Sequence, residues 1–442
     1  MTMVLALIVT IGVLVTFHEY GHFWVARRCG VKVLRFSVGF GKPLVSWKDK
    51  QGTEFAIAAI PLGGYVKMLD AREGEVSPEE ASQEFTSKPV WQRIAIVAAG
   101  PIANFLFAIF VYWILFMVGV VNLKPFVGHV MPGSPADQAG LASGVTISQV
   151  DNTQVQTWQD MSMALVERIG ESGQIAMTTQ AGETIDIPIS DWLAGKRDPS
   201  PAGELGLSVR VLDEYPIIEA VSEGGRAQAA GIEVGDVLVA ADGEAIRYWY
   251  NWVTKFQSSP ETPIELEFER NGLVSTVSIT PEAKQTDNGT IGFVGLGPKF
   301  NDIPDSLNVT RQYGPFDALV KATVQTWDTI ALSLKLFGKM ITGEISPNNL
   351  SGPISIAKMA DQSAKAGLEP FVAFLAFISI SLGVVNLLPV PVLDGGHLVY
   401  YLAELIRGKP LPERVQIIGF QIGASLLLFV MLFAIFNDFA RL

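Results

Sequence analysis

Four long apolar stretches constrain the fold of this chain more than any other feature of its sequence. Each is uncharged or nearly so, and they cover residues 1–26, 94–123, 371–393 and 415–436. Roughly 20 apolar residues in a helix are enough to cross the hydrocarbon core of a bilayer. Because 49% of all residues are hydrophobic and only 17% are charged, we predict a polytopic α-helical membrane protein with four transmembrane helices.

The first stretch has the length of a signal peptide, but Arg27 and Arg28 follow it rather than precede it, and no small-residue cleavage site ends it. We therefore interpret it as a retained span. Basic residues are in excess in 27–93, whereas 124–370 is strongly acidic. Since basic loops stay in the cytosol, we expect 27–93 and 395–414 to be cytosolic and both termini to be periplasmic. The overall acidity argues against nucleic-acid binding.

The cytosolic loop contains short β-prone runs separated by Gly and Pro, at 36–43, 54–59 and 60–68. This pattern predicts β-hairpins in a membrane-associated β-region. The sheet either re-enters the membrane against protein or lies on the membrane surface, and the sequence favours neither. The acidic, polar segment 70–88 reads as a mobile loop.

An internal repeat with a constant offset of 91 residues occupies 124–283. The run that starts Gly133-Ser134-Pro135 returns at Gly224-Gly225. The pattern resembles a permuted PDZ domain and predicts two extracytoplasmic PDZ-like α+β domains, at 124–200 and 201–283.

A PDZ domain binds an extended peptide by adding it as a strand to a sheet edge. In the second copy, the glycine-rich run 203–207 is our candidate loop for a terminal carboxylate, through Leu205, Gly206 and Leu207. A spacer with a closed groove is the alternative.

A further segment, 284–370, is predicted to be a periplasmic linker with an amphipathic helix at 315–342. Apolar residues such as Leu319, Trp327 and Phe337 recur there at helical spacing, with Lys321 and Asp328 between them. The helix is too polar to span. We expect it to lie in the membrane interface or to pack against the spans.

The first apolar stretch contains His18-Glu19-Tyr20-Gly21-His22. Ionisable groups at membrane depth are costly, and they indicate function by default. On a helix, positions i and i+4 share a face, so His18 and His22 can bind one metal ion while Glu19 acts on a metal-bound water. This pattern is typical of a zinc peptidase.

A zinc peptidase needs a third protein ligand and an open position for water. Asp394 is the only acidic residue near the end of the third stretch, and the predicted topology brings it to the same leaflet as the two histidines. Pro389 and Pro391 should unwind the helix before it. The amide of Asn386, upstream at membrane depth, is a candidate to bind a substrate carbonyl or oxyanion. We assign His397 no ligand role.

Three motifs together resemble the site-2 protease family. They are the run at 18–22, the run Gly100-Pro101-Ile102-Ala103-Asn104, and the run from Asn386 to Gly396. The resemblance implies an intramembrane zinc metalloprotease of the bacterial inner membrane with its site toward the cytosol. Members cut transmembrane segments of anti-sigma factors after a first periplasmic cut, and they clear remnant signal peptides.

The resemblance also implies roles for single residues. Zinc would be held by His18, His22 and Asp394, Glu19 would be the base, and Asn386 would contact substrate. Asn104 and Gly100 would support the site, and 36–68 would correspond to a membrane-re-entrant β-loop.

A helical peptide bond is shielded by its own hydrogen bonds, so we expect the substrate to bind unwound, paired with a β-edge. The strand 54–59 with Ile57, and the loop residues Gly39, Phe40 and Gly41, are the candidates. The predicted partners are single-span membrane proteins and the lipid bilayer, and the chain is predicted to be a monomer.

A function of another class remains open: a non-catalytic membrane scaffold or receptor that binds peptide ends through its PDZ-like domains. A vestigial metal site should have lost Glu19 or a ligand, and none is lost here.

Overall fold

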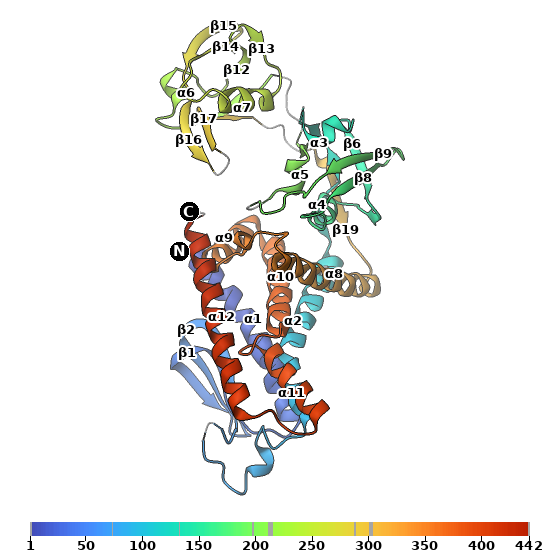
Figure 1. The fold of residues 1–442 in the computed structure, drawn as a ribbon, viewed down its shortest axis with the longest axis vertical. Coiled ribbons are helices and arrows are strands. Elements are labelled where there is room, and N and C mark those ends of the chain that lie inside the picture. Colours follow the sequence, from blue (N-terminus) through green and yellow to red (C-terminus); the bar gives the residue numbers. More distant parts are fainter. Residues whose placement is uncertain are drawn as a thin grey trace. The chain divides into compact units, whose positions relative to one another are not determined.

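The computed structural model describes residues 2–72, 74–131, 133–196, 199–210, 215–286, 289–299 and 304–440. The chain forms two compact units (Figure 1). The helical unit combines Met1–Val120 with Arg311–Leu442, and the repeat unit comprises Val121–Thr310. The two ends of the sequence therefore build one body, and the internal repeat builds the other.

Four long helices of the helical unit are apolar enough to cross a membrane by length and composition. They are α1 (Thr2–Arg28), α2 (Val90–Val118), α10 (Leu368–Leu387) and α12 (Glu413–Ala440). They correspond to the four predicted stretches, but two predicted ends are wrong. Helix α2 ends at Val118, and 120–123 form a strand instead; helix α10 ends at Leu387, before the predicted end at 393. Met1 lies outside the described residues. Helix α2 packs between α1 and α10, around a core that includes Leu14, Phe107 and Ile380.

Helix α10 ends at Leu387, and an irregular stretch with Pro389 and Pro391 follows it. The predicted unwinding before Asp394 is thus confirmed. The predicted loop over 395–414 is wrong, because Asp394 begins a further helix, α11 (Asp394–Arg407). Gly395 and Gly396 are not turn residues there. A Cβ on either would lie within 2.4 Å of a backbone oxygen of the preceding stretch, so they let the helix start against it.

The predicted β-region contains strands β1 (Val33–Lys48) and β2 (Glu54–Met68). Their register resolves four paired segments in the order 43–48, 54–60, 33–40, 63–68. Val38 lies opposite both Ile57 and Gly64, and Val45 also lies opposite Ile57. Segment 54–60 is therefore paired on both sides, and the edges of the sheet are 43–48 and 63–68.

In the described part of segment 70–88, predicted as a mobile loop, both ends bond to one buried carboxylate. Glu84 is 5% exposed. It accepts hydrogen bonds from the backbone N–H groups of Ala71, Thr86 and Ser87, at 3.0, 3.0 and 2.6 Å. A short 3₁₀ turn, Ala81–Gln83, precedes it.

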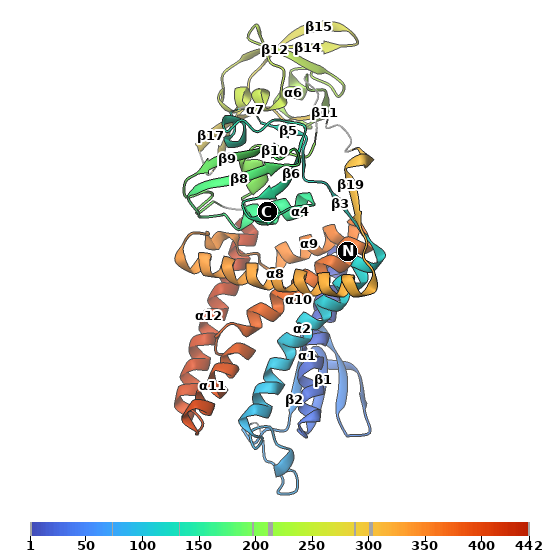
Figure 2. The same cartoon turned by 90° about the vertical axis from the view of Figure 1, so that its right-hand side faces the viewer.

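The amphipathic helix predicted at 315–342 is confirmed as α8 (Pro315–Thr342), and Figure 2 shows it lying across one end of α2 and α10. Small residues such as Ala318 and Ala322 form its buried face, whereas Trp327 is 68% exposed. Helix α9 (Pro353–Ala366) follows α8. Its N-terminus is capped by Asp438 of α12, which accepts from the N–H of Ile354 at 2.7 Å.

Each copy of the repeat has its own core and its own set of strands and short helices. The first copy contains β4 (Phe126–Val127), β5 (His129–Val130), α3 (Pro135–Gln138), β6 (Val145–Val150), β7 (Thr153–Gln154), α4 (Trp158–Val166), β8 (Gly173–Thr179), β9 (Thr184–Ile189), α5 (Pro201–Glu204) and β10 (Leu207–Ser208). The second contains β11 (Ile218–Val221), α6 (Arg226–Ala229), β12 (Val237–Ala241), β13 (Glu244–Ala245), α7 (Trp249–Gln257), β14 (Ile264–Arg270), β15 (Leu273–Ile279), β16 (Glu282–Thr286), β17 (Gly289–Phe293) and β18 (Leu296–Pro298). Strands β3 (Val120–Leu123) and β19 (Asn308–Arg311) pair with each other in a separate two-stranded sheet.

The offset of 91 is preserved in three dimensions. Asp151 and Asp242 both adopt positive φ, at 50° and 52°. The Asp151 carboxylate accepts from the backbone N–H of Ala176 at 3.0 Å, and that of Asp242 accepts from Glu265 at 2.9 Å. The two copies thus build the same turn with the same residue.

The assignment of 203–207 to the second copy is wrong. Leu205 and Leu207 are buried in the core of the first copy, and the Gly206 carbonyl accepts from the N–H of Met131 at 2.8 Å. In a permuted domain the closing segment comes last in the chain, so the boundary at 200/201 cut it off. In the second copy the Gly295 carbonyl accepts in the same way from Ser222, so that copy extends beyond 283.

Candidate metal centre

Helix α1 places the two histidines one turn apart on the face that meets Asp394. The Nε2 atoms of His18 and His22 are 3.2 Å apart. Asp394 Oδ2 lies 3.2 Å from His18 Nε2 and 3.5 Å from His22 Nε2. Ligand atoms about 2.1 Å from a tetrahedral zinc ion lie about 3.4 Å from one another. The three atoms that the sequence selects therefore have the mutual spacing of zinc ligands.

The carboxylate is not explained by hydrogen bonding. Asp394 Oδ2 is buried and has no hydrogen-bond partner in the described part of the chain, although two imidazole nitrogens face it. A buried charge without a donor is costly unless a cation compensates it. Two imidazoles and one carboxylate are also a donor set that zinc accepts in peptidases, so these residues fit a zinc ion.

The ring of His22 is fixed from α2. Its Nδ1 lies 2.8 Å from the Ile96 carbonyl oxygen, which accepts a proton but cannot donate one. Nδ1 therefore carries the hydrogen, and Nε2 presents its lone pair toward Asp394 and His18. Such a bond to the second ring nitrogen is the usual way in which a metal-binding histidine is oriented.

Asn104 holds His18 in the corresponding way. Asn104 is fully buried, and its amide nitrogen Nδ2 lies 3.1 Å from His18 Nδ1. A histidine that binds a metal through Nε2 carries its proton on Nδ1, which an amide oxygen accepts. Asn104 Oδ1 is buried and lacks a partner among the described residues, and half a turn of the amide plane brings it to His18. The support role predicted for Asn104 thus has a chemical basis.

Gly100 lies directly beneath both rings. A Cβ at this position would lie 2.3 Å from His22 Nε2 and 2.8 Å from His18 Cε1. Neither ring can move away without losing its bond to α2, so this position requires glycine.

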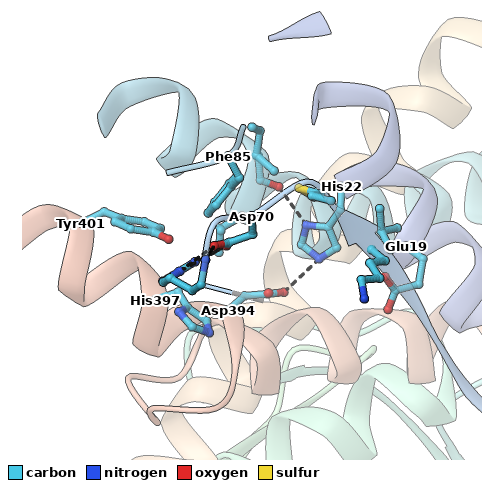
Figure 3. Close-up of a pocket in the computed structure, with 13 residues that line it drawn as sticks. Glu19, His22, Asp70, Phe85, Asp394, His397 and Tyr401 are labelled. Carbon is cyan, nitrogen blue, oxygen red and sulfur yellow. Dashed lines mark hydrogen bonds and ion pairs between the residues drawn. The ribbon is translucent and has the colours of Figure 1, made fainter. Parts of the chain in front are cut away.

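Glu19 lies beside His22, at the wall of a cavity of about 310 Å³ (Figure 3). Val66 lines the cavity together with Glu19, and a Cβ on Gly64 would lie 3.4 Å from Glu19 Cγ. Both residues belong to the edge segment 63–68. Sequence reasoning did not assign this segment to the site, although the pair Gly63-Gly64 marks a close backbone approach.

The same cavity continues to a polar wall that includes Asp70, Arg72 and His397. Arg72 donates to Asp70 Oδ1 at 2.9 Å. Hydrogen bonding to Asp70 raises the pKa of Arg72 above its ordinary value, and burial lowers the pKa of His397. The Arg72 side chain is 55% exposed, so this wall of the cavity reaches solvent.

The remaining predicted residues lie elsewhere. Asn386 is on the last turn of α10 and is not among the residues that line the cavity. Phe40 stacks on Tyr65, with ring centroids 6.2 Å apart, between Gly39 and Gly41, which have φ values of 93° and 87°.

Comparisons with known proteins identify one family model and several similar sequences. A family model described as peptidase family M50 matches residues 6–430. Regulator of sigma-E protease RseP of Escherichia coli is 45% identical over 98% of each chain. Protease RseP of Yersinia pestis is 44% identical over 99% of this chain and 98% of its own, and a putative zinc metalloprotease of Vibrio cholerae is 42% identical over the same shares.

Among solved structures, a PDZ domain of an SdrC-like protein from Listeria monocytogenes is similar to 20% of this chain and 92% of its own. The identity is 17% and the TM-score is 0.18. We draw no argument from this likeness.

Proposed function

The chain belongs to peptidase family M50, the site-2 protease family, and is therefore a membrane metalloprotease; from that premise we propose that it holds one zinc ion through His18, His22 and Asp394. The observation that carries the proposal is the spacing of 3.2, 3.2 and 3.5 Å among their ligand atoms. When bound, zinc would polarise the scissile carbonyl and acidify a water molecule. The spacing argues against the scaffold hypothesis, since no ligand is missing.

Glu19 is the general base of this proposal. It sits beside His22 and faces the cavity, so it can take a proton from water and return it to the leaving amine. The polar wall of the cavity, with Asp70 and Arg72, is the proposed route for water from the cytosol. The role of Asn386 as a carbonyl or oxyanion donor remains a prediction, because the cavity does not include it.

The proposed substrates are transmembrane segments of single-span membrane proteins. The name of the relative from E. coli refers to regulation of sigma-E. By analogy we propose that a pre-cleaved membrane-anchored anti-sigma factor is a substrate, and that remnant signal peptides are others. The proposed location is the bacterial inner membrane, with both termini periplasmic and the site toward the cytosol.

The strand predicted to pair with the substrate, 54–59, does not lie at an edge of the sheet. Segment 54–60, which contains Ile57, is paired on both sides and has no free edge for a substrate. Segment 63–68 is an edge of the sheet; its Gly64 lies against Glu19, and its Val66 lines the same cavity. We propose that an unwound substrate segment pairs along 63–68, where its peptide bond comes next to the base.

The repeat unit contains no ionisable group of the metal centre. We propose that its two copies are PDZ-like domains that select substrates, either by docking a newly exposed peptide end or by excluding bulky extracytoplasmic domains. The similar backbone bonds to Gly206 and Gly295 support an equivalent loop in each copy.

The test uses purified protein and a tagged single-span substrate. Wild type should contain about one zinc per chain by elemental analysis and should cut the substrate. Glu19→Gln should keep the zinc and lose cleavage by at least about a hundredfold. Full zinc content in a His18→Ala, His22→Ala double variant would disprove the assignment of the ligands, and near-normal turnover by Glu19→Gln would disprove the base.

A further inference from the structure

A buried ion pair joins α2 to α11, 311 residues apart in sequence. Arg93 donates to both carboxylate oxygens of Glu404, at 3.0 and 2.6 Å, and its Nε donates to the Lys88 carbonyl at 3.0 Å. The two side chains are 11% and 14% exposed. Burying two charges is costly, and such a pair is weak evidence for stability by itself. Its value must come from what it holds in place.

What it holds is the helix that begins with Asp394. Helix α10 ends at Leu387, and two prolines interrupt the backbone before α11, so Asp394 does not lie on a continuous extension of α10. Helix α11 is instead placed against α2. Tyr401 packs in one core with Ile96 and Val97 of α2, and the Arg93 guanidinium lies 4.9 Å from the centroid of the Tyr401 ring.

Four residues of α2 lie on one face of that helix, at a spacing of three or four: Arg93, Ile96, Gly100 and Asn104. The Ile96 carbonyl orients His22, the Asn104 amide orients His18, and Gly100 makes room for both rings. Arg93 connects the same face to the third proposed ligand, because its partner Glu404 is on the helix that starts with Asp394. All three proposed ligands are thus positioned by contacts with one face of α2.

We propose that Arg93 and Glu404 are positioning residues that place Asp394 as the third metal ligand. The inference rests on the proposed metal centre. Neither side chain touches a ligand; the pair acts by fixing α11 against α2, ten residues along the chain from the carboxylate. The cost of burying the pair is offset by a ligand geometry that the proline-interrupted backbone does not provide.

Metal affinity measures this role directly. Glu404→Gln keeps the size of the side chain but removes its charge. In chelator competition, purified Glu404→Gln and Arg93→Gln should each bind zinc about tenfold more weakly or worse than wild type, as is typical for groups behind a metal ligand. In cobalt-loaded protein, the absorption spectrum of Glu404→Gln should shift toward that of Asp394→Ala.

A double-mutant cycle separates positioning from general support. If the pair acts through Asp394, then Glu404→Gln should cause no further loss of zinc affinity in an Asp394→Ala background. Lys32→Gln is the matched control, because it breaks the Lys32–Glu80 ion pair, which joins no ligand-bearing element; its zinc affinity should equal that of wild type. A variant with wild-type zinc affinity and a lower melting temperature, or equal losses with and without Asp394, would overturn the inference. Absence of zinc from the wild type would instead refute the proposed function.

Discussion

The helical unit and the repeat unit are assembled in opposite ways, one from segments far apart in the sequence and the other from neighbouring segments. In the repeat unit, one local design is built twice, and corresponding positions of the two copies carry different residues. Val145 in the first copy stands where the second has Asp236, which is 1% exposed and bonded to Arg270 at 2.6 Å. In the helical unit, α1, α2, segment 63–68 and α11 are far apart in the sequence and come together at the candidate metal centre. The geometry of this centre depends on contacts between single atoms. A local fold tolerates exchange of its parts, whereas a site assembled by long-range contacts does not.

The largest effect should come from Gly100→Ala. The added Cβ would lie 2.3 Å from His22 Nε2, so the ring must leave either the Ile96 carbonyl or the metal. We expect zinc affinity and cleavage to fall by about a hundredfold, the upper end for disturbed support of a ligand. Zinc content and turnover of the purified variant measure this.

Gly12→Ala is the matched control. Gly12 lies in α1, and no atom lies within 4 Å of the position that a Cβ would take there. Its zinc content and turnover should be those of wild type. Equal losses in both variants would show that α1 and α2 tolerate no added methyl group anywhere, and the special status of Gly100 would then disappear.

A smaller effect is expected at the sheet edge that faces Glu19. A Cβ on Gly64 would lie 2.7 Å from the Ser37 carbonyl oxygen and 2.8 Å from Val15. Gly64→Ala should therefore displace the edge and lower cleavage about tenfold, an order of magnitude that corresponds to about 1.4 kcal/mol of transition-state binding. Zinc content should not change.

The substrate distinguishes strand pairing from a general defect. A central Pro or Gly in the substrate span should raise cleavage by wild type, because it exposes backbone groups that an edge can bind. Gly74→Ala, at a position with no neighbour within 4 Å, should behave as wild type. If helix breakers have no effect and Gly64→Ala cleaves normally, the edge does not bind substrate.

The contrast between the units also explains how far the sequence could predict this molecule. Local patterns were sufficient for the four apolar helices, for α8 and for the repeat, because periodicity and spacing are local signals. The three candidate ligands could be predicted because His18 and His22 are one turn apart and Asp394 is the only acidic residue near the end of the third apolar stretch. The edge 63–68 and the Arg93–Glu404 pair were missed, since register and contacts over hundreds of residues leave no local pattern. The run 203–207 was misassigned because the permutation places it beside the second copy.

Selectivity should depend on the repeat unit more than catalysis does. Replacement of Val121–Thr310 by a short linker should leave zinc content unchanged and keep cleavage of substrates with short periplasmic tails within about threefold, since the metal ligands and Glu19 lie in the helical unit. Discrimination against long-tailed substrates should relax. Paired short-tailed and long-tailed substrates measure this ratio. Loss of all cleavage in a folded, zinc-containing deletion would mean that the repeat unit supports the helical unit directly.

The smallest effect on activity should come from Asp236→Asn, which makes the second copy more like the first. Burial by itself would raise the pKa of Asp236, but hydrogen bonds from Arg270 lower it below its ordinary value. A carboxylate with a depressed pKa stabilises the fold above its unfolded pKa, and this stability is lost as pH falls through the folded pKa. At neutral pH the variant should lose about 1 kcal/mol of local stability, seen as faster amide hydrogen exchange in β12 and β14. The difference from wild type should shrink below about pH 4, where the unfolded carboxyl is protonated.

Glu233→Gln is the control, because Glu233 pairs with the same arginine but is 69% exposed, and its exchange should be that of wild type. Cleavage of short-tailed substrates should be unchanged in both variants. A pH-independent difference would show that packing around Asp236, rather than its charge, stabilises the second copy.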